Sequence, residues 1–253
     1  MALISQNSVH TANAWGPSEL NSLTNGLDAL GLHASAGQLA KLQTYARLLL
    51  KWNRTYNLVG ATTPQVLIES HLLDSLAALP ALDRWLPVGN PPLLDIGSGA
   101  GLPGIALAIL RDHLPLMLVE PIGKKAAFLR QAIAQCGLRQ VRVLKSKVED
   151  LDLSQDLSPD LKPDGQPAPH FICRAFTSLE RFAALCAPHV GQGSLLFAMK
   201  AARVGEELAQ MHGSIEVLAV EPLHTTDRDV QRTLVVMRVE APLATLDATR
   251  PGR

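Results

Sequence analysis

The sequence predicts an α/β protein with a mostly parallel, twisted sheet that carries helices on both faces. A short apolar run at residues 92–96 leads into a glycine-rich turn and then into the helical segment 105–110, which is typical of a buried parallel strand followed by a crossover helix. Further short apolar runs alternate with helical segments. Two late runs, at 215–221 and 232–239, follow one another directly, so we expect an antiparallel end to the sheet.

The segment ahead of the sheet divides into a tail and a cap. Residues 1–21 are polar and include the pair Gly16-Pro17, so we expect a flexible tail. Residues 22–88 are expected to form a small helical cap that precedes the sheet.

Two helices are expected in the cap. The first begins near Ser35, and the second runs from Thr63, as its N-cap, to about Leu79, with a proline in its first turn. Apolar residues recur at spacings of three and four in the first helix. They are Leu39, Leu42, Tyr45, Leu48, Leu49 and Trp52.

The sheet domain is expected to span residues 89–241, and residues 242–253 form a second tail. A segment rich in Asp, Ser and Pro at 151–170 is predicted to be a mobile insertion. Around it we expect strands at 116–120, 141–144, 170–176 and 193–200, and helices at 126–136, at about 177–185 and at 204–212.

Composition limits the class of protein. The chain has 253 residues, of which 47% are hydrophobic, so it can bury a sizeable core. The formal net charge is zero, and any RNA contact must therefore come from local patches. The three cysteines lack metal-ligand spacing, so we expect buried thiols, a reducing compartment and no metal site. No apolar run is long enough to span a bilayer, and we expect a monomeric, cytoplasmic protein without a membrane partner.

The glycine-rich turn predicts a nucleotide-type site. Gly97, Gly99 and Gly101 let the backbone turn sharply and let a ligand lie against it. Dinucleotide enzymes, methyltransferases and turns without a ligand all share such a motif. Asp95 would repel a pyrophosphate but attract the amino and sulfonium groups of S-adenosylmethionine, and Glu120, after the next strand, is placed to accept ribose hydroxyls. The sequence favours S-adenosylmethionine over a dinucleotide or an empty site.

A charged residue follows each expected parallel strand. Because the carboxyl ends of parallel strands meet at one edge of a sheet, we expect these residues to converge on the ligand crevice. They are Asp95, Glu120, Glu149, Arg174 and Lys200.

With these residues in place, the chain resembles the ribosomal RNA small subunit methyltransferase G family, also called the glucose-inhibited division protein B family. The likeness covers about residues 39–239, and its combination of Trp-Asn-Tyr-Asn-Leu, His-Asp-Ser and Gly-Leu-Pro-Gly in this order is specific. Two departures are the replacement of the family's Asp-Ser-Leu by Glu120-Pro121-Ile122 and of its Leu-Lys-Gly by Met199-Lys200-Ala201. The matching motifs lie at residues 51–58, 71–75, 95–104, 124–130, 148–149, 173–176, 198–200 and 232–236.

The resemblance implies a Rossmann-like class I fold that depends on S-adenosylmethionine. It also implies methylation of ring nitrogen 7 of a guanine in the decoding-region loop of 16S ribosomal RNA, with that RNA or a small-subunit precursor as partner. This nitrogen has a free lone pair and no proton, so the reaction needs positioning rather than a general base, and the base must be unpaired or flipped out. A methyltransferase of small molecules or proteins, which the net charge favours, and a non-catalytic nucleotide-binding module are the alternatives.

The catalytic candidates are Arg174 and Lys200. Arg174 is expected to bind the guanine oxygen or a neighbouring phosphate, and its alternative is a salt bridge to Glu149 or Asp95. The candidate cofactor-binding residues are Asp95, Gly97, Ser98, Gly99, Gly101, Leu102, Glu120, Val148, Glu149 and Arg174.

Several basic residues are candidates for an RNA track, with an ordinary solvated charge as the alternative for each. His71 and Asp74, one turn apart, either reach the ligands or form a structural pair. Trp52 is predicted to belong to the core rather than to stack on RNA. The RNA-binding candidates are Lys51, Arg54, His71, Lys124, Lys125 and Arg130.

Overall fold

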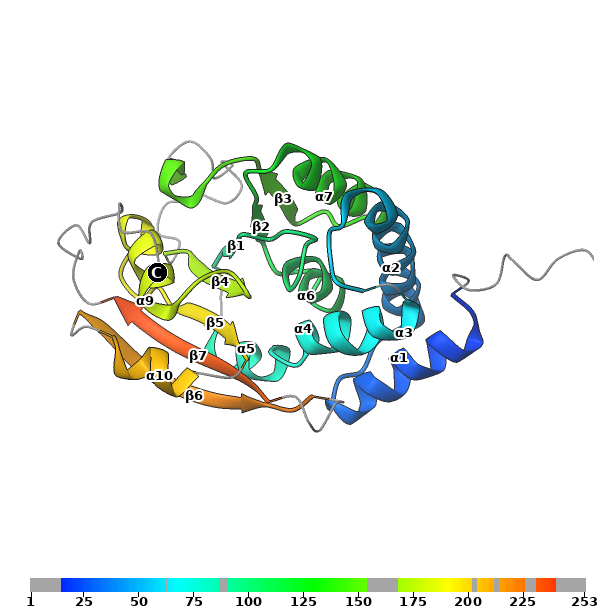
Figure 1. Cartoon of the computed structure of the whole chain (residues 1–253), viewed down its shortest axis with the longest axis horizontal. Coiled ribbons are helices and arrows are strands. Elements are labelled where there is room, and N and C mark those ends of the chain that lie inside the picture. The colour runs from blue at the N-terminus through cyan, green and yellow to red at the C-terminus, as the bar shows by residue number, and fades with distance from the viewer. Residues whose placement is uncertain are drawn as a thin grey trace, which may run out of the picture.

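The computed structural model describes residues 15–61, 63–86, 91–153, 168–201, 204–211, 214–225 and 231–239. This part of the chain forms a seven-stranded sheet in the order β3-β2-β1-β4-β5-β7-β6 (Figure 1). The first five strands pair in parallel, whereas β7 pairs antiparallel with both β5 and β6. The predicted α/β fold with an antiparallel end is confirmed. The strands are β1 (Leu93–Ile96), β2 (Leu116–Val119), β3 (Val141–Leu144), β4 (His170–Arg174), β5 (Leu196–Lys200), β6 (Ile215–Leu223) and β7 (Arg232–Val239).

Helices cover both faces of the sheet (Figure 1). In β2, Leu116 and Leu118 belong to one apolar cluster and Met117 and Val119 to the other, because successive strand residues point to opposite faces. Burial on both faces explains why the inner strands are continuously apolar. The first cluster includes residues of α1 (Pro17–Ala29), α2 (Ala36–Tyr56), α6 (Gly104–Leu110) and α7 (Gly123–Cys136). The second includes residues of α9 (Leu179–Cys186), α10 (Val204–Ala209) and the short turn η2 (Val148–Asp150), and the turn η4 (Ala187–His189) follows α9.

The first helix corrects the expected boundary of the tail. The prediction assigned residues 1–21 to a flexible segment, but α1 begins at Pro17 and Trp15 is buried. Gly16-Pro17, which suggested a break in the chain, instead begins a helix, because proline suits the first helical position. The backbone N–H of Gly16 donates to the carboxylate of Glu19 over 2.8 Å. The cap therefore begins earlier than predicted.

Four pieces stand in and after the expected second helix, the last of them beginning at Leu79, where that helix was expected to end. They are α3 (Pro64–Leu67), the π-helical turn η1 (Ile68–Leu73), α4 (Asp74–Leu76) and α5 (Leu79–Trp85). The cap signals at Thr63 and Pro64 marked the start of the helical region but do not reveal the wider π turn that follows it. Such turns recur at functional sites, and this one contains His71 and ends directly before Asp74.

Helix α2 joins the cap to the sheet domain. The buried hydroxyl of Tyr45 donates to the carbonyl of Ala100, in the glycine turn, over 2.6 Å. Trp52 packs against Phe128 of α7, with ring centroids 5.6 Å apart, and its indole N–H donates to Gln131 over 3.0 Å. The prediction that Trp52 belongs to the core is confirmed.

The thiols behave as predicted. Cys136, Cys173 and Cys186 are free and buried, and burial raises the pKa of Cys136 to about 11. In the described ranges, no helix is long and apolar enough to cross a membrane, and no group of three His, Cys, Asp or Glu residues is placed to hold a metal. Most of the predicted mobile insertion at 151–170, namely residues 154–167, and the tail at 242–253 lie outside the described residues.

Replacing Tyr45 tests the link between α2 and the glycine turn. We expect Tyr45→Phe to lower the free energy of unfolding by about 1–2 kcal/mol, because the buried carbonyl of Ala100 loses its donor. Thr44, on the same helix, donates to the carbonyl of Ala40 in an exposed position, so Thr44→Ala is the control and should change stability by less than about 0.5 kcal/mol. Equal losses in urea unfolding would contradict this role of Tyr45.

Candidate functional site

The turn between β1 and α6 is held in shape by a carboxylate from the neighbouring strand. Glu120 follows β2 and is buried; its Oε2 accepts from the backbone N–H of Gly99 and its Oε1 from that of Ile122, both over 2.9 Å. Gly101 has a φ of 85°, and a Cβ there would lie 2.5 Å from Ile105 Cδ1, so only glycine fits. The turn is therefore rigid before any ligand binds.

Asp95, at the end of β1, has one oxygen satisfied and one without a donor. Its Oδ2 accepts from the backbone N–H of Gly104 over 3.0 Å, whereas the buried Oδ1 has no hydrogen-bond partner among the described residues. Burial raises the pKa of Asp95 to about 7, against the lowering effects of the Gly104 N–H and of Arg174. An unpaired buried carboxylate oxygen is unfavourable unless a ligand supplies a donor or a positive charge. The unpaired Oδ1 of Asp95 thus fits a cationic ligand.

The rest of the glycine turn packs closely. Ser98 is buried and donates its hydroxyl to the carbonyl of Asp95 over 2.7 Å, and Leu102 is also buried. Gly97 and Gly99 share the left-handed φ of Gly101, at 69° and 58°. The predicted residues of this turn therefore lie together between β1 and α6.

A second group of charges surrounds Asp74, at the start of α4. Its Oδ2 accepts from Nη1 of Arg174 over 2.8 Å, and its Oδ1 accepts from Nε of Arg232. Nδ1 of His71 lies 3.5 Å from Nη2 of Arg174. Burial, and then the charge of Arg174, lowers the pKa of His71 to about 4, so the imidazole is neutral at pH 7. One buried carboxylate therefore joins the cap to β4 and β7.

Lys200, at the end of β5, shares a cavity with Arg174. Its Nζ donates to the carbonyl of Thr177 over 2.6 Å and lies 2.8 Å from Oε2 of Glu207. The two catalytic candidates thus meet at the carboxyl ends of β4 and β5, as predicted. The cavity measures about 280 Å³ and is lined by Asp74, Arg174, Ala175, Met199, Lys200, Ala201, Glu207 and Arg232.

The partner of Arg174 differs from the expected one. The alternative prediction paired it with Glu149 or Asp95, but its carboxylate is Asp74, 100 residues away in sequence. Glu149 is exposed and lies 3.9 Å from Arg181, and Val148 is buried, with its carbonyl 2.8 Å from His189 Nε2. Sequence reasoning also missed Arg232, although it lies at the start of a matching motif.

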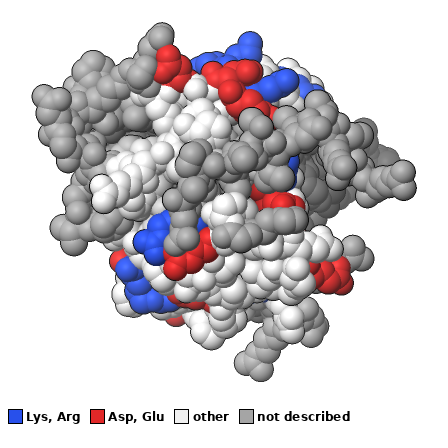
Figure 2. All heavy atoms as spheres, turned by 90° about the vertical axis from the view of Figure 1, so that its left-hand side faces the viewer, with Lys and Arg blue, Asp and Glu red and all other residues white. Residues whose placement is uncertain are grey.

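The other predicted RNA-binding residues gather where α2 packs on α7. Lys51 and Arg54 are exposed near the end of α2, and Lys124 and Arg130 are exposed on α7 beside the half-buried Lys125. Nζ of Lys124 lies 5.7 Å from the centroid of the Tyr56 ring. Figure 2 shows a different face, on the side of α9, where basic and acidic side chains stand next to one another. These predicted RNA-binding residues therefore lie on α2 and α7.

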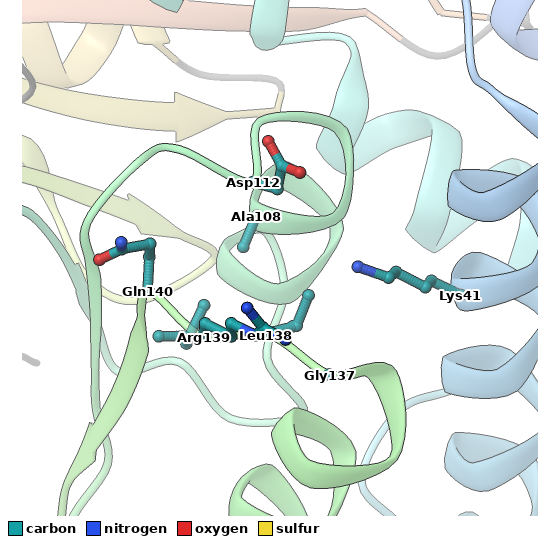
Figure 3. Close-up of a pocket in the computed structure, with 8 residues that line it drawn as sticks. Lys41, Ala108, Asp112, Gly137, Leu138, Arg139 and Gln140 are labelled. Carbon is teal, nitrogen blue, oxygen red and sulfur yellow. The ribbon is translucent and has the colours of Figure 1, made fainter.

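Another pocket, of about 300 Å³, lies at the opposite edge of the sheet (Figure 3). Lys41 of α2 extends toward the loop from Gly137 to Gln140 that precedes β3, and Asp112 comes from the loop ahead of β2. These are the amino ends of the strands, whereas the glycine turn follows the carboxyl end of β1. This pocket is therefore separate from the site described above.

The parallel strands, the antiparallel end and the glycine turn after β1 define a class I S-adenosylmethionine-dependent methyltransferase fold. The crystal structure of MtNAS in complex with MTA and tNA superimposes with a TM-score of 0.50, covering 87% of this chain and 81% of that one at 14% identity. That likeness concerns the fold alone.

Sequence comparison then identifies the family. The model of the GidB family, described as rRNA small subunit methyltransferase G, matches residues 38–235. Ribosomal RNA small subunit methyltransferase G of Azoarcus sp. is 42% identical over 215 residues, which are 85% of this chain and 94% of that protein. The protein of the same name from Bordetella pertussis is 38% identical, over 85% of this chain and 91% of its own length. The chain belongs to the ribosomal RNA small subunit methyltransferase G family, which confirms the resemblance.

Removing the charge of Asp74 should destabilise the protein. In Asp74→Asn, two partly buried guanidinium groups lose their counter-ion, and we expect a loss of about 3 kcal/mol in the free energy of unfolding. The control is Glu216→Gln, which breaks an exposed pair with Arg238 and should cost less than about 1 kcal/mol. Similar losses for both variants in denaturant titrations would show that the Asp74 cluster contributes no more than a surface pair.

The raised pKa of Asp95 predicts a pH dependence for the ligand-free protein. The folded state binds a proton that the unfolded state has already lost, so stability falls as pH rises from about 4 to about 7. Asp95→Asn removes this cost, and its stability relative to the unmodified chain should rise across that range by on the order of 3 kcal/mol. Parallel stability curves for the two proteins, measured by urea unfolding between about pH 4 and about pH 7, would contradict this assignment.

Proposed function

We propose that this chain methylates ring nitrogen 7 of a guanine in the decoding-region loop of 16S ribosomal RNA, with S-adenosylmethionine as methyl donor. One observation carries the proposal: the Arg174 and Lys200 cavity opens at the same edge of the sheet as the glycine turn with its unpaired Asp95 oxygen. Its relatives of at least 38% identity are named ribosomal RNA small subunit methyltransferase G. The substrate is the RNA itself or a small-subunit precursor, encountered in the cytoplasm.

The glycine turn is the proposed holder of the methyl donor. Oδ1 of Asp95 would accept from its amino group, and Glu120 has lone pairs left for ribose hydroxyls after binding two backbone N–H groups. Val148 and Glu149, which follow β3, are proposed to flank the adenine. When bound, S-adenosylmethionine supplies an electrophilic methyl group.

The remaining residues have to place the base, because ring nitrogen 7 carries no proton that a base must remove. The reaction thus needs no side chain that removes a proton. In keeping with this, the lowered pKa of His71 makes it a weak base, and Nζ of Lys200 is paired with Glu207. Arg174 is proposed to donate to the guanine oxygen or to an adjacent phosphate. Asp74 fixes the guanidinium of Arg174 before the substrate arrives, so positioning supplies most of the rate gain.

The exposed cations on α2 and α7 are proposed to bind RNA phosphates. Lys51 and Arg54 lie on α2 and Lys124 and Arg130 on α7, and Nζ of Lys124 lies 5.7 Å from the centroid of the Tyr56 ring. Each phosphate contact releases counter-ions, so binding through this track weakens as salt rises. The net charge of zero requires such a local track.

A methyltransferase of small molecules or proteins is the second candidate. The observation in its favour is the neutral chain, which lacks the overall positive charge of many RNA-binding proteins. Its substrate would occupy the same cavity of about 280 Å³. A map of RNA modification separates the two functions, because only the first alters 16S ribosomal RNA.

The test is a mass-spectrometric map of 7-methylguanosine in 16S ribosomal RNA from cells with and without this protein. One modified guanine should disappear with the gene and return with the unaltered chain and with Arg238→Ala, which removes an exposed charge on β7. Arg174→Ala should not restore it, because methyl transfer falls about 100-fold or more when a positioned donor is lost.

Two results would contradict parts of this proposal. An unchanged map would reject 16S ribosomal RNA as the substrate and favour the second candidate. If Arg174→Ala weakened S-adenosylhomocysteine binding, measured by calorimetry, as much as methyl transfer, Arg174 would serve the cofactor rather than the base.

A further inference from the structure

Phe176 stands apart from the other phenylalanines of the chain. The sequence contains five, and four of them, Phe128, Phe171, Phe182 and Phe197, are fully buried, whereas Phe176 is 38% exposed. A buried ring contributes to the core, but an exposed one keeps apolar surface in water. Within the described part of the chain, no other aromatic ring contacts Phe176. An aromatic ring is therefore partly exposed beside the candidate site.

The backbone at the end of β4 directs this ring. Ala175 has a φ of 50°, which is unfavourable for a residue with a Cβ and is typically retained at functional sites. Arg174 and Phe176 flank it, and the side chain of Arg174 pairs with Asp74 at the cavity. Ala175 thus separates Arg174, which lines the cavity, from Phe176, which is not among the residues that line it.

The ring of Phe176 lies against the glycine turn. A Cβ on Gly97 would come within 2.4 Å of Phe176 Cδ2 and 2.8 Å of Cε2, so the missing side chain of Gly97 makes room for the ring. Gly97 directly follows Ile96, the last residue of β1, two residues after Asp95. The ring therefore lies on the part of the turn that we propose holds the methyl donor, two residues along the chain from Arg174, which lines the cavity.

We infer that Phe176 stacks on the target guanine and holds its ring in line with the donated methyl group; this inference rests on the proposed function. A base taken out of its RNA stack loses a π-face contact, and a protein ring replaces it without regard to sequence. Arg174 on one side of Ala175 then fixes the edge of the guanine, and Phe176 on the other side fixes its plane. Together they set both the position and the tilt of ring nitrogen 7.

The test uses small ribosomal subunits from cells that lack this protein, with three variants of the full chain. Phe176→Leu keeps an apolar side chain without a π-face, Phe176→Tyr keeps the π-face, and Val220→Ala removes an equally exposed apolar group on β6. We expect Phe176→Leu to lower kcat/KM about tenfold or more, the usual effect of losing one base–aromatic stack. Phe176→Tyr and Val220→Ala should retain activity, and all variants should bind S-adenosylhomocysteine like the unaltered chain.

Three outcomes would overturn the inference. Full activity of Phe176→Leu would show that the ring does not contact the base. Equal losses in methyl transfer and in S-adenosylhomocysteine binding would assign the ring to the cofactor pocket. Equal losses of kcat/KM in Phe176→Leu and Phe176→Tyr would show that stacking by the aromatic ring does not contribute. The unaltered chain distinguishes the two proposals: if it methylates ring nitrogen 7 while Phe176→Leu does so equally well, only the role of Phe176 fails. If it modifies no guanine, the proposed function fails as well.

Discussion

The structure depends on one buried carboxylate that two arginines share. Asp74 belongs to the helical cap, Arg174 to the end of β4 and Arg232 to the start of β7, and the carboxylate has only 6% of its side chain exposed. A buried charge is unfavourable unless it is paired and hydrogen-bonded, so these three segments are held in one arrangement. That arrangement fixes Arg174, and all three charged residues line the cavity.

A similar constraint acts on the glycine turn. Glu120 holds two backbone N–H groups and Tyr45 holds the carbonyl of Ala100, so the turn is bound from the sheet and from the cap. Asp95, in contrast, is buried with one oxygen unpaired. Its burial lowers the stability of the free protein at neutral pH and favours a cationic ligand. Asp95 thus lowers the free energy of unfolding of the ligand-free protein at the position where we expect the positive charge of the ligand.

Much of the site could be predicted because the carboxyl ends of parallel strands meet. Asp95, Glu120, Arg174 and Lys200 each lie at the carboxyl end of a strand or directly after it, and the last two indeed line one cavity. The predicted partner of Arg174 was wrong, since proximity in the sheet suggested Glu149 or Asp95 whereas the cap supplies Asp74. The tail boundary was wrong as well, because Gly16-Pro17 begins a helix instead of interrupting the chain. The first error concerns a long-range contact and the second a helix start, and the periodicity of apolar residues specifies neither.

By itself the sequence determined the class of fold, the glycine turn and the strand-end charges, because these depend on local apolar patterns and on the geometry shared by all parallel sheets. Only the tertiary structure decided how the cap completes the site. The π turn before Asp74, the left-handed backbone at Ala175 and the approach of Phe176 to Gly97 arise from packing between segments far apart in the chain. A one-dimensional pattern specifies which face of each element is buried, but not which side chain of another element it meets there.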